Sequence, residues 1–513
     1  MISKFKLFFI IGVLLTATCL IFRNFDYQMA MMYQDDGPIA YSYALKEPTK
    51  YQLDEILHLA PFFYWATIIN WGNDLLSKLL HIDIFYVVWF NTAFTFFLLG
   101  LGAIFCYNKC CKDWITTSTA TLLLILIWPP QWNLAQYNVR EFLFTPYPGD
   151  AVLPFVLTVF GCLVGGRYLL CLIVLFFAGF VHITIPLQTS IIVAVYFFIE
   201  ILKRETPPLI AARNLLILGV IVLFQILRTY YLGRTTSNPT SDTDLLFALN
   251  HNVHIIPWAT STWRQTITNV ALVVMFAFAA YFFTRALIPY RYKILFWILA
   301  AVSFVSIWVH LIAVNYQIIT LMQVNLFRIT LLFSLMAIPV LGALILKRYI
   351  PHSINLLVIA ALSIGLLKFA HTTGTNFAYP EAIAMKDVQL WAKDNLDSAS
   401  MVATMETSWR TLSNRPAYFM WPMMLYRYYR DPFLKRREDD LLKFYQIGLD
   451  SALKLSLNEL QTMVKKRFEK LTNQDFLSLK QYAPVTYLLI QKPTHLTLPK
   501  AYENARFILF SLK

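Results

Sequence analysis

Residues 7–22, LFFIIGVLLTATCLIF, form an uncharged apolar run, and the polar stretch NFDYQMAMMYQDDGP follows at residues 24–38. With the two residues before it, the run is long enough to cross a bilayer as a helix. Lys4 and Lys6 precede it, but the run is too long for a typical signal peptide and no small-x-small cleavage site follows. We therefore expect a retained membrane anchor, followed by a loop that leaves the membrane.

The composition is that of a protein with much of its surface in lipid. The 513 residues are 58% hydrophobic and 14% charged, whereas soluble domains are about half apolar and about a quarter charged. The formal net charge of +14 is explained by basic cytoplasmic loops, so we expect no nucleic-acid partner. The six cysteines lie in or beside apolar runs, which indicates that there is no disulfide framework.

Apolar stretches of spanning length recur over the first 370 residues. We predict about eleven transmembrane helices, at 5–22, 84–106, 115–131, 150–165, 167–183, 186–202, 209–232, 268–285, 293–314, 327–346 and 353–370. The fourth and fifth of these are short and are joined only by Gly165-Gly166-Arg167. The sequence therefore predicts an α-helical polytopic transmembrane domain over residues 1–370.

Basic residues set the expected orientation. If the N-terminus is cytoplasmic, every inner loop contains at least one Lys or Arg, as the positive-inside rule requires. The outer loops are then 23–83, 129–150 and 233–267, and they are longer and rich in aromatic residues and proline. Residues 56–80 of the first outer loop are apolar on one face, which predicts an interfacial helix or a short re-entrant pair. We expect a multi-pass protein of a bacterial inner membrane.

The composition changes at about residue 371. Residues 386–395 predict an amphipathic helix, and 400–405, 487–490 and 507–512 predict strands, with a loop at 409–416. Alternating helix and strand signals favour a small soluble α/β domain over residues 371–513, which the orientation places outside the cytoplasm, in the periplasm. The charged run at 435–440, KRREDD, is interpreted as a solvated helix face.

The acidic pair Asp35-Asp36 is the first candidate for chemistry. A carboxylate outside the first span can act as a general base on an acceptor hydroxyl. Alternatively, Asp35 or Asp36 can hold a divalent metal, Mg or Mn, that offsets the charge of a phosphate leaving group. Residues 34–38, QDDGP, also fit a solvated turn or a helix cap.

Several basic groups are expected near the outer ends of spans. His182 and His310 are ionisable residues at a depth where such groups usually face a cavity or a partner. Arg328 begins the tenth span from outside, against the positive-inside trend, and Arg140 lies at a similar depth. Such residues can bind a phosphate, although core histidines with satisfied hydrogen bonds and snorkelling arginines are the alternatives.

The sequence contains no phosphate-binding P-loop, no dinucleotide glycine fingerprint and no H-E-x-x-H motif. Energy for a reaction must then come from an activated substrate or an ion gradient. The long outer loops and short inner ones indicate that the protein acts on the outer side of the membrane.

The layout resembles the GT-C superfamily of membrane glycosyltransferases, which use polyprenyl-phosphate-linked sugars. The matching features are the first span, the acidic pair Asp35-Asp36 in the first outer loop, an interfacial helical stretch, some eleven spans and an outer C-terminal domain. The segments that resemble recurring pieces of bacterial proteins with this architecture are GFVHITI (179–185), QVNLFR (323–328), VQLWAKDN (388–395), SMVATMETSW (400–409) and YAPVTYLLIQ (482–491).

The resemblance implies a transferase that moves a sugar from a polyprenyl-phosphate donor to a glycan or lipid acceptor on the outer face. Asp35 or Asp36 would be the catalytic base or metal-linked acid, and Arg140, His182, His310 and Arg328 would contact the lipid phosphate or the sugar. Two alternatives stay open. A flippase for a lipid-linked glycan would favour charges at mid-membrane, and few are found. A non-catalytic assembly or binding protein would tolerate replacement of both acids.

Overall fold

The computed structural model describes residues 2–23, 37–111, 113–127, 148–204, 206–234, 245–246, 248–249, 281, 288–376, 380–422, 431–455 and 457–512. The chain divides into two compact units. The first unit comprises residues 1–23, 90–231 and 261–373, and the second comprises 24–89, 232–260 and 374–513. Residues 37–89, which come soon after the first span in the sequence, therefore cluster with the C-terminal part.

The first unit is built from apolar helices. They are α1 (Ile2–Phe22), α6 (Ile84–Cys111, which begins in the second unit), α7 (Trp114–Ile127), α9 (Pro148–Ala151), α10 (Leu153–Val164), α11 (Tyr168–Val181), α12 (Thr184–Leu202), α13 (Pro208–Arg234), α16 (Tyr290–Asn315), α17 (Ile319–Val324), the 3-10 turn η2 (Leu326–Arg328), α18 (Ile329–Tyr349) and α19 (His352–Asn376). Within the described residues, six helical segments are long and apolar enough to cross a membrane, and four more apolar helices are shorter. The chain is a polytopic helical membrane protein.

Every predicted span except one overlaps with a helix of the structure. The exception, 268–285, lies outside the described residues apart from Tyr281. The two short spans are α10 and α11, which are joined by a tight turn in which Gly166 has a φ of +69°. Only glycine adopts this left-handed conformation without strain, which explains the closely spaced helices.

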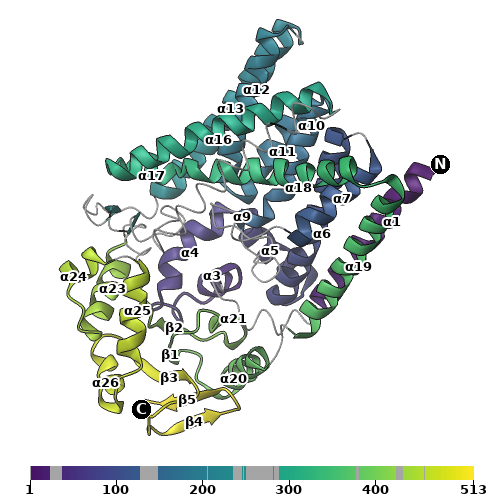
Figure 1. Ribbon diagram of the computed structural model, residues 1–513. Helices are drawn as coiled ribbons and strands as arrows, with labels where there is room; N and C mark the ends of the chain where they lie inside the picture. The colour runs from purple at the N-terminus through teal and green to yellow at the C-terminus, as the bar shows by residue number, and fades with distance from the viewer. Residues whose placement is uncertain are drawn as a thin grey trace. The chain divides into compact units, whose positions relative to one another are not determined.

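Helix α18 lies at the core of the first unit, beside α7 and α16 (Figure 1). The hydroxyls of Tyr107 in α6 and Tyr292 in α16 donate hydrogen bonds of 2.7 Å to the α18 carbonyls of Leu335 and Met336. Buried tyrosines need such acceptors. Gly161 of α10 packs so closely on α6 that a Cβ there would collide with Phe105, which is the small-residue packing typical of membrane helices.

The second unit begins with three short helices, α3 (Gly37–Lys46), α4 (Glu55–Ala66) and α5 (Ile68–Leu80). Asp54 caps α4, because its carboxylate accepts a hydrogen bond from Ile56 N at 2.9 Å. Thr67 interrupts the apolar stretch with an extended backbone and caps α5 through Ile69 N. Residues 56–80, predicted as an interfacial helix or a short re-entrant pair, thus form two helices, α4 and α5.

The C-terminal part is a three-layer α/β domain. Its sheet has the strand order β2-β1-β3-β5-β4, formed by β1 (Met401–Thr404), β2 (Ala417–Phe419), β3 (Val485–Gln491), β4 (Lys500–Glu503) and β5 (Phe507–Ser511). β2, β1 and β3 are parallel, while β5 and β4 add antiparallel partners. Its helices are α20 (Glu381–Asn395), α21 (Arg410–Ser413), α23 (Pro432–Phe444), α24 (Leu449–Lys454), α25 (Leu457–Phe468), α26 (Asn473–Ser478) and the 3-10 turn η3 (Leu479–Gln481).

Alternating strand residues separate two apolar cores. Met401 and Ala403 of β1 contact the core that includes α23 and α25, while Val402 contacts the core on the α20 face. In β5, Ile508 and Phe510 belong to the first core and Leu509 to the second. This period of two is that of a strand buried on both faces, and it confirms the predicted α/β fold and the predicted strands at 400–405, 487–490 and 507–512.

Helix α3, helix α4 and the C-terminal domain share one apolar cluster. Leu434 of α23 is fully buried together with Ala40, Ile56, Ala60 and Tyr64. The sequence predicts a domain boundary at residue 371, with the first loop on the membrane side of it. In the structure, residues 37–89 belong to the same compact unit as residues 380–512.

Candidate functional site

A buried carboxylate ties together the three helices that come after the acidic pair. Asp74 of α5, which is 2% exposed, accepts hydrogen bonds from Ser42 Oγ at 2.7 Å and Tyr64 Oη at 2.8 Å. It also pairs with Lys46 Nζ at 2.8 Å and Lys78 Nζ at 2.7 Å. Each carboxylate oxygen therefore has one neutral and one cationic donor, contributed by all three helices.

The donors fix the charge of this centre. Burial alone would raise the pKa of the Asp74 carboxyl, but hydrogen bonds from Lys46, Lys78, Ser42 and Tyr64 hold that pKa well below its usual range. Burial and the hydrogen bond to Asp74 raise the pKa of Tyr64 well above its usual value. At neutral pH the centre is thus one carboxylate, one neutral phenol and two ammonium groups, with one positive charge in excess.

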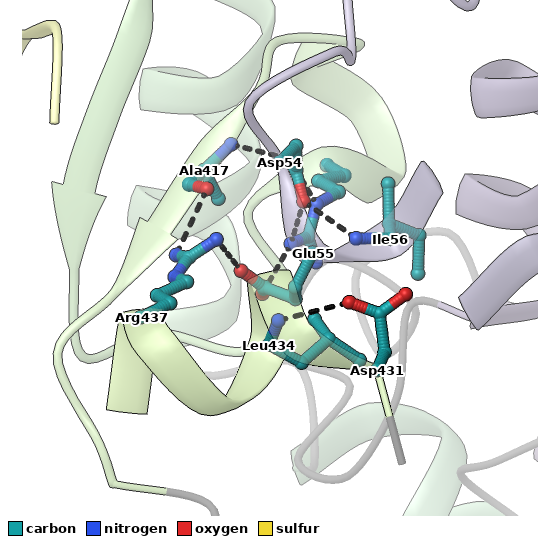
Figure 2. A network of polar contacts seen from close by, with 8 residues as sticks. Asp54, Glu55, Ile56, Ala417, Asp431, Leu434 and Arg437 are labelled. Atoms are coloured by element: carbon teal, nitrogen blue, oxygen red, sulfur yellow. Dashed lines mark hydrogen bonds and ion pairs between the residues drawn. The ribbon is translucent and has the colours of Figure 1, made fainter. Parts of the chain in front are cut away.

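A second network fixes the start of α4 to the C-terminal domain (Figure 2). Arg410 of α21 forms a bidentate pair with Asp54, with Nε 2.8 Å from Oδ2 and Nη2 2.6 Å from Oδ1. Its Nη2 also lies 2.6 Å from Glu55 Oε1. Arg437 of α23 pairs with the other oxygen of Glu55, and the backbone of Ala417 in β2 donates to Asp54 at 2.7 Å.

The four charges of this network balance and are buried. Asp54 is 0%, Glu55 2%, Arg410 1% and Arg437 7% exposed. The guanidinium groups also lie 4.3 Å from aromatic ring centres, Arg410 over Phe419 and Arg437 over Tyr418, an arrangement that adds cation–π attraction. Removing one member of such a network leaves a buried charge without compensation.

Further contacts join the same two segments. Tyr51 Oη and Lys50 Nζ, which precede α4, both lie within 3.0 Å of Asn414 Oδ1 at the end of α21. His58 stacks on Phe433 with a ring separation of 4.1 Å, and its Nδ1 lies 3.2 Å from Asp431 Oδ2. Burial alone would raise the pKa of Asp431, but the contact with His58 lowers it. The pKa of Asp431 therefore lies below its usual value. The α3–α4 segment is therefore part of the C-terminal domain's fold.

Three of the predicted site residues, Asp35, Asp36 and Arg140, lie outside the described residues. The helix directly after the acidic pair is described, because α3 begins at Gly37. The pair thus immediately precedes a helix that the Asp74 centre connects to α4 and α5.

The other three predicted residues belong to the first unit. His182 ends α11, and its Nδ1 accepts a hydrogen bond from Ile185 N at 3.1 Å, so the neutral ring carries its proton on Nε2. His310 of α16 is 1% exposed and lies against Phe327 of η2, with ring centres 5.6 Å apart. Arg328 ends η2. His310 therefore lies at the α16–η2 contact, against the residue that precedes Arg328.

The same region joins α12 to η2. Gln188 Nε2 of α12 donates to the backbone oxygen of Asn325 at 2.9 Å, and Asn325 has a left-handed backbone with a φ of 47°. This hydrogen bond connects the turn before Arg328 to α12, which begins at Thr184, two residues after His182. The structure thus brings His182, His310 and Arg328 to one end of the α11–α12–α16–α18 group.

The interpretation of residues 435–440 as a solvated helix face is wrong for two of them. Arg437 and Glu438 are 7% and 1% exposed, respectively, whereas the side chain of Arg436 is 85% exposed. The reason is that α23 packs on α4 and β2, and a charged residue can be buried where it meets an opposite charge. The loop predicted at 409–416 contains the helical turn α21, which carries Arg410.

Sequence reasoning also missed Asp54, Glu55 and Asp74. Asp54-Glu55 is an acidic pair before an apolar helix, which is itself an N-cap signal. Its partners are more than 350 residues away along the chain, since Arg410 is 356 positions from Asp54. Among the described residues, no group of three or more His, Cys, Asp and Glu side chains is placed to hold a metal ion.

No family model matches the sequence. No curated protein matches it either. Among solved structures, the chain is similar to the crystal structure of ArnT from Cupriavidus metallidurans bound to undecaprenyl phosphate, with 98% of each chain covered, 11% sequence identity and a TM-score of 0.44. A likeness of this strength carries no argument about activity, so the proposed function rests on the residues of this chain.

Proposed function

We propose that the protein is a membrane glycosyltransferase that moves a sugar from a polyprenyl-phosphate-linked donor to a glycan or lipid acceptor on the outer face of a bacterial inner membrane. One observation carries the proposal. The acidic pair Asp35-Asp36 directly precedes α3, and two buried charge networks hold the α3–α5 segment. A fixed neighbouring helix can position a carboxylate for catalysis, since reacting groups must be held in a defined geometry.

The proposed reaction needs a base and a stabilised leaving group. One carboxylate of the pair accepts the proton of the acceptor hydroxyl while the hydroxyl oxygen bonds to the anomeric carbon. The bond between that carbon and the phosphate oxygen breaks, and the electron pair leaves with the polyprenyl phosphate. Such a donor is already activated, which agrees with a sequence that lacks nucleotide-binding motifs.

Cationic groups would stabilise the departing phosphate. Lys46 and Lys78 are suited to this role, because their side chains are 38% and 61% exposed and together exceed the charge of Asp74 by one. His182 is suited as a neutral donor through Nε2. Arg140, His310 and Arg328 keep the phosphate- or sugar-binding role proposed for them, and Asp35 or Asp36 can alternatively bind Mg or Mn.

The proposal is tested by the cellular glycan profile of Asp35→Asn and Asp36→Asn variants, with expression and membrane insertion checked. Asp450→Asn is the matched control, because Asp450 lies on the surface of α24 in the C-terminal domain. We expect one of the two variants to insert normally and lose the glycan product, while the control keeps it.

The alternatives give different profiles. A non-catalytic assembly protein keeps its product in both variants, because the acids then form only a solvated turn. A flippase gives lipid-linked glycan that accumulates on the cytoplasmic face when the whole protein is deleted, with no loss of glycosidic bond formation. Either result contradicts the transferase proposal.

A further inference from the structure

A cavity of about 660 Å³ lies between the first turns of α11 and α13. Its lining is residues 166–170, Ile173, Thr206, Pro207, Ile210, Arg213 and Asn214. All belong to the first unit. None is among the residues assigned to sugar transfer, so the cavity is separate from the proposed reaction.

The polar part of the lining attracts anions. Arg167 and Arg213 are exposed at its rim. Arg167 also stands at the N-cap of α11 without a side-chain cap, so the first N–H groups of that helix have no side-chain acceptor there. Helix α13 begins at Pro208, directly after Pro207 of the lining. Two helix N-termini and two guanidinium groups together favour a negatively charged group.

Asn214 gives an independent indication of a ligand. Its side chain is 0% exposed, and its Oδ1 accepts a hydrogen bond from Arg213 Nη2 at 3.3 Å. Its Nδ2 has no hydrogen-bond partner in the part of the chain that the structure describes. A buried amide donor without an acceptor destabilises a fold, so an acceptor oxygen supplied by a ligand in the cavity would satisfy it.

The surrounding charges are also mostly positive. Arg291 lies against Gly166, and its guanidinium carbon is 5.8 Å from the ring centre of Tyr168. Lys203 and Arg204 end the neighbouring helix α12 and are exposed. Glu200 is buried behind the wall, where the hydroxyls of Tyr168 and Thr206 each donate to its Oε2 at 2.9 Å. The open side of the cavity is therefore cationic.

The rest of the lining is apolar and exposed. Leu169, Leu170 and Ile173 of α11 are 54%, 42% and 45% exposed, and Ile210 of α13 is 39% exposed. Exposed leucines and isoleucines on helices of a membrane protein face the acyl chains of lipids. An anion site that opens onto such a surface suits an amphiphile and not a free ion.

We propose that this cavity binds the phosphate head group of an anionic phospholipid, whose acyl chains lie on the apolar surfaces of α11 and α13. The phosphate oxygens accept hydrogen bonds from Arg167, Arg213 and Asn214 Nδ2. Basic pockets between transmembrane helices on the cytoplasmic side are a common form of lipid site, and the orientation expected from the basic residues puts this cavity on that side.

The test is native mass spectrometry of the full chain in detergent with equal amounts of dioleoyl phosphatidylglycerol and dioleoyl phosphatidylcholine. The two lipids share their acyl chains and differ in net charge. We expect the wild type to retain phosphatidylglycerol about tenfold more strongly. The double variant Arg167→Gln/Arg213→Gln should lose this preference. Asn214→Asp, which keeps the acceptor for Arg213 but adds a negative charge, should weaken retention as well.

Arg348→Gln is the matched control, since Arg348 is another exposed arginine at the end of α18 and does not line the cavity. Its lipid preference should equal that of the wild type. Equal retention of both lipids by the wild type contradicts the proposal, as does an unchanged preference in the double variant. Inorganic phosphate that displaces phosphatidylglycerol at equal concentration would assign the cavity to a small free anion instead.

Discussion

At the scale of single residues, burial separates charged side chains that look alike in the sequence. Arg436 and Arg437 are neighbours in α23, yet the first has an 85% exposed side chain and the second 7%. The exposed one lies 3.8 Å from Asp440, a surface pair of small energetic value. The buried one neutralises Glu55. Their effects on stability should therefore differ strongly.

Arg437→Gln should lower the stability of the second unit by about 3 kcal/mol, because it leaves Glu55 with less compensation for its buried charge. For a unit of this size that corresponds to a fall in the unfolding midpoint of roughly 6–12 °C. The measurement is thermal unfolding of the purified chain in detergent. Arg436→Gln, one position away, should change the midpoint by about 1 °C or less. Equal shifts in the two variants would contradict the assigned role of the network.

The residues of this network show why the sequence did not predict it. The spacing of Asp54, Glu55 and Ile56 signals a helix start, and α4 does begin at Glu55. Their partners Arg410 and Arg437 come from segments some 350 residues away in the sequence. No local sequence pattern predicts such a tertiary contact. Without knowledge of how its helix packs, a charged run such as 435–440 is predicted to be exposed to solvent.

At the scale of elements, the sequence predicts a helix or strand that has an amphipathic pattern or a buried apolar run, and it misses strands that have a very short run or none. The amphipathic pattern of residues 386–395 predicted α20, and the apolar runs at 487–490 and 507–512 predicted β3 and β5. The sequence does not predict β2, which has only 3 residues, or β4. β4 is also largely exposed at the sheet edge, so it lacks the apolar run that marks a buried strand.

The three helices α3, α4 and α5 are held together by Asp74, which predicts a specific pH dependence. The pKa of Asp74 is lower in the fold than in the unfolded chain. Its contribution to stability is therefore complete above the unfolded value of about 4 and is lost as the pH falls through the lower folded value. Asp74→Asn should thus destabilise the wild type by about 1.5–3 kcal/mol at neutral pH.

The measurement is the difference in unfolding midpoint between the wild type and Asp74→Asn from pH 8 to pH 3. We expect a constant difference down to about pH 4 and a decrease below it. Asp450→Asn serves as the control for a surface carboxylate. A difference that instead declines between pH 8 and pH 6 would show that another group governs the stability of the three helices.

At the scale of the whole molecule, composition and hydropathy predict a polytopic membrane protein, and the apolar helices of the structure confirm this prediction. The division into units was harder to predict, because hydropathy assigns a segment to lipid or water but not to a folding partner. Residues 37–89 come soon after the first span in the sequence, yet they cluster with the domain that begins some 300 residues later. Asp35 and Asp36 are candidates because of their position after the first span and the resemblance to membrane glycosyltransferases, and their role stays a prediction.

The orientation inferred from the basic loops can be tested with single cysteines. All six native cysteines are free, and only Cys19 is exposed, so Cys19→Ser gives a background with little reactivity. In this background, Asp450→Cys should react with a membrane-impermeant maleimide added to the periplasmic side. Arg348→Cys should react only after the membrane is opened. The reverse pattern would place the C-terminal domain in the cytoplasm and remove the basis for an outer-face reaction.

The most direct test of the proposed function is turnover by the purified protein in liposomes. The substrate is a polyprenyl-phosphate-linked sugar extract from the source membranes, supplied with the envelope glycan fraction as acceptor. We measure the release of free polyprenyl phosphate together with the glycosylated acceptor. We expect the wild type to form both products in equal amounts. Asp35→Asn or Asp36→Asn should slow this reaction about 10²–10⁴-fold while the variant retains the wild-type unfolding midpoint. Wild-type rates in both variants would contradict it.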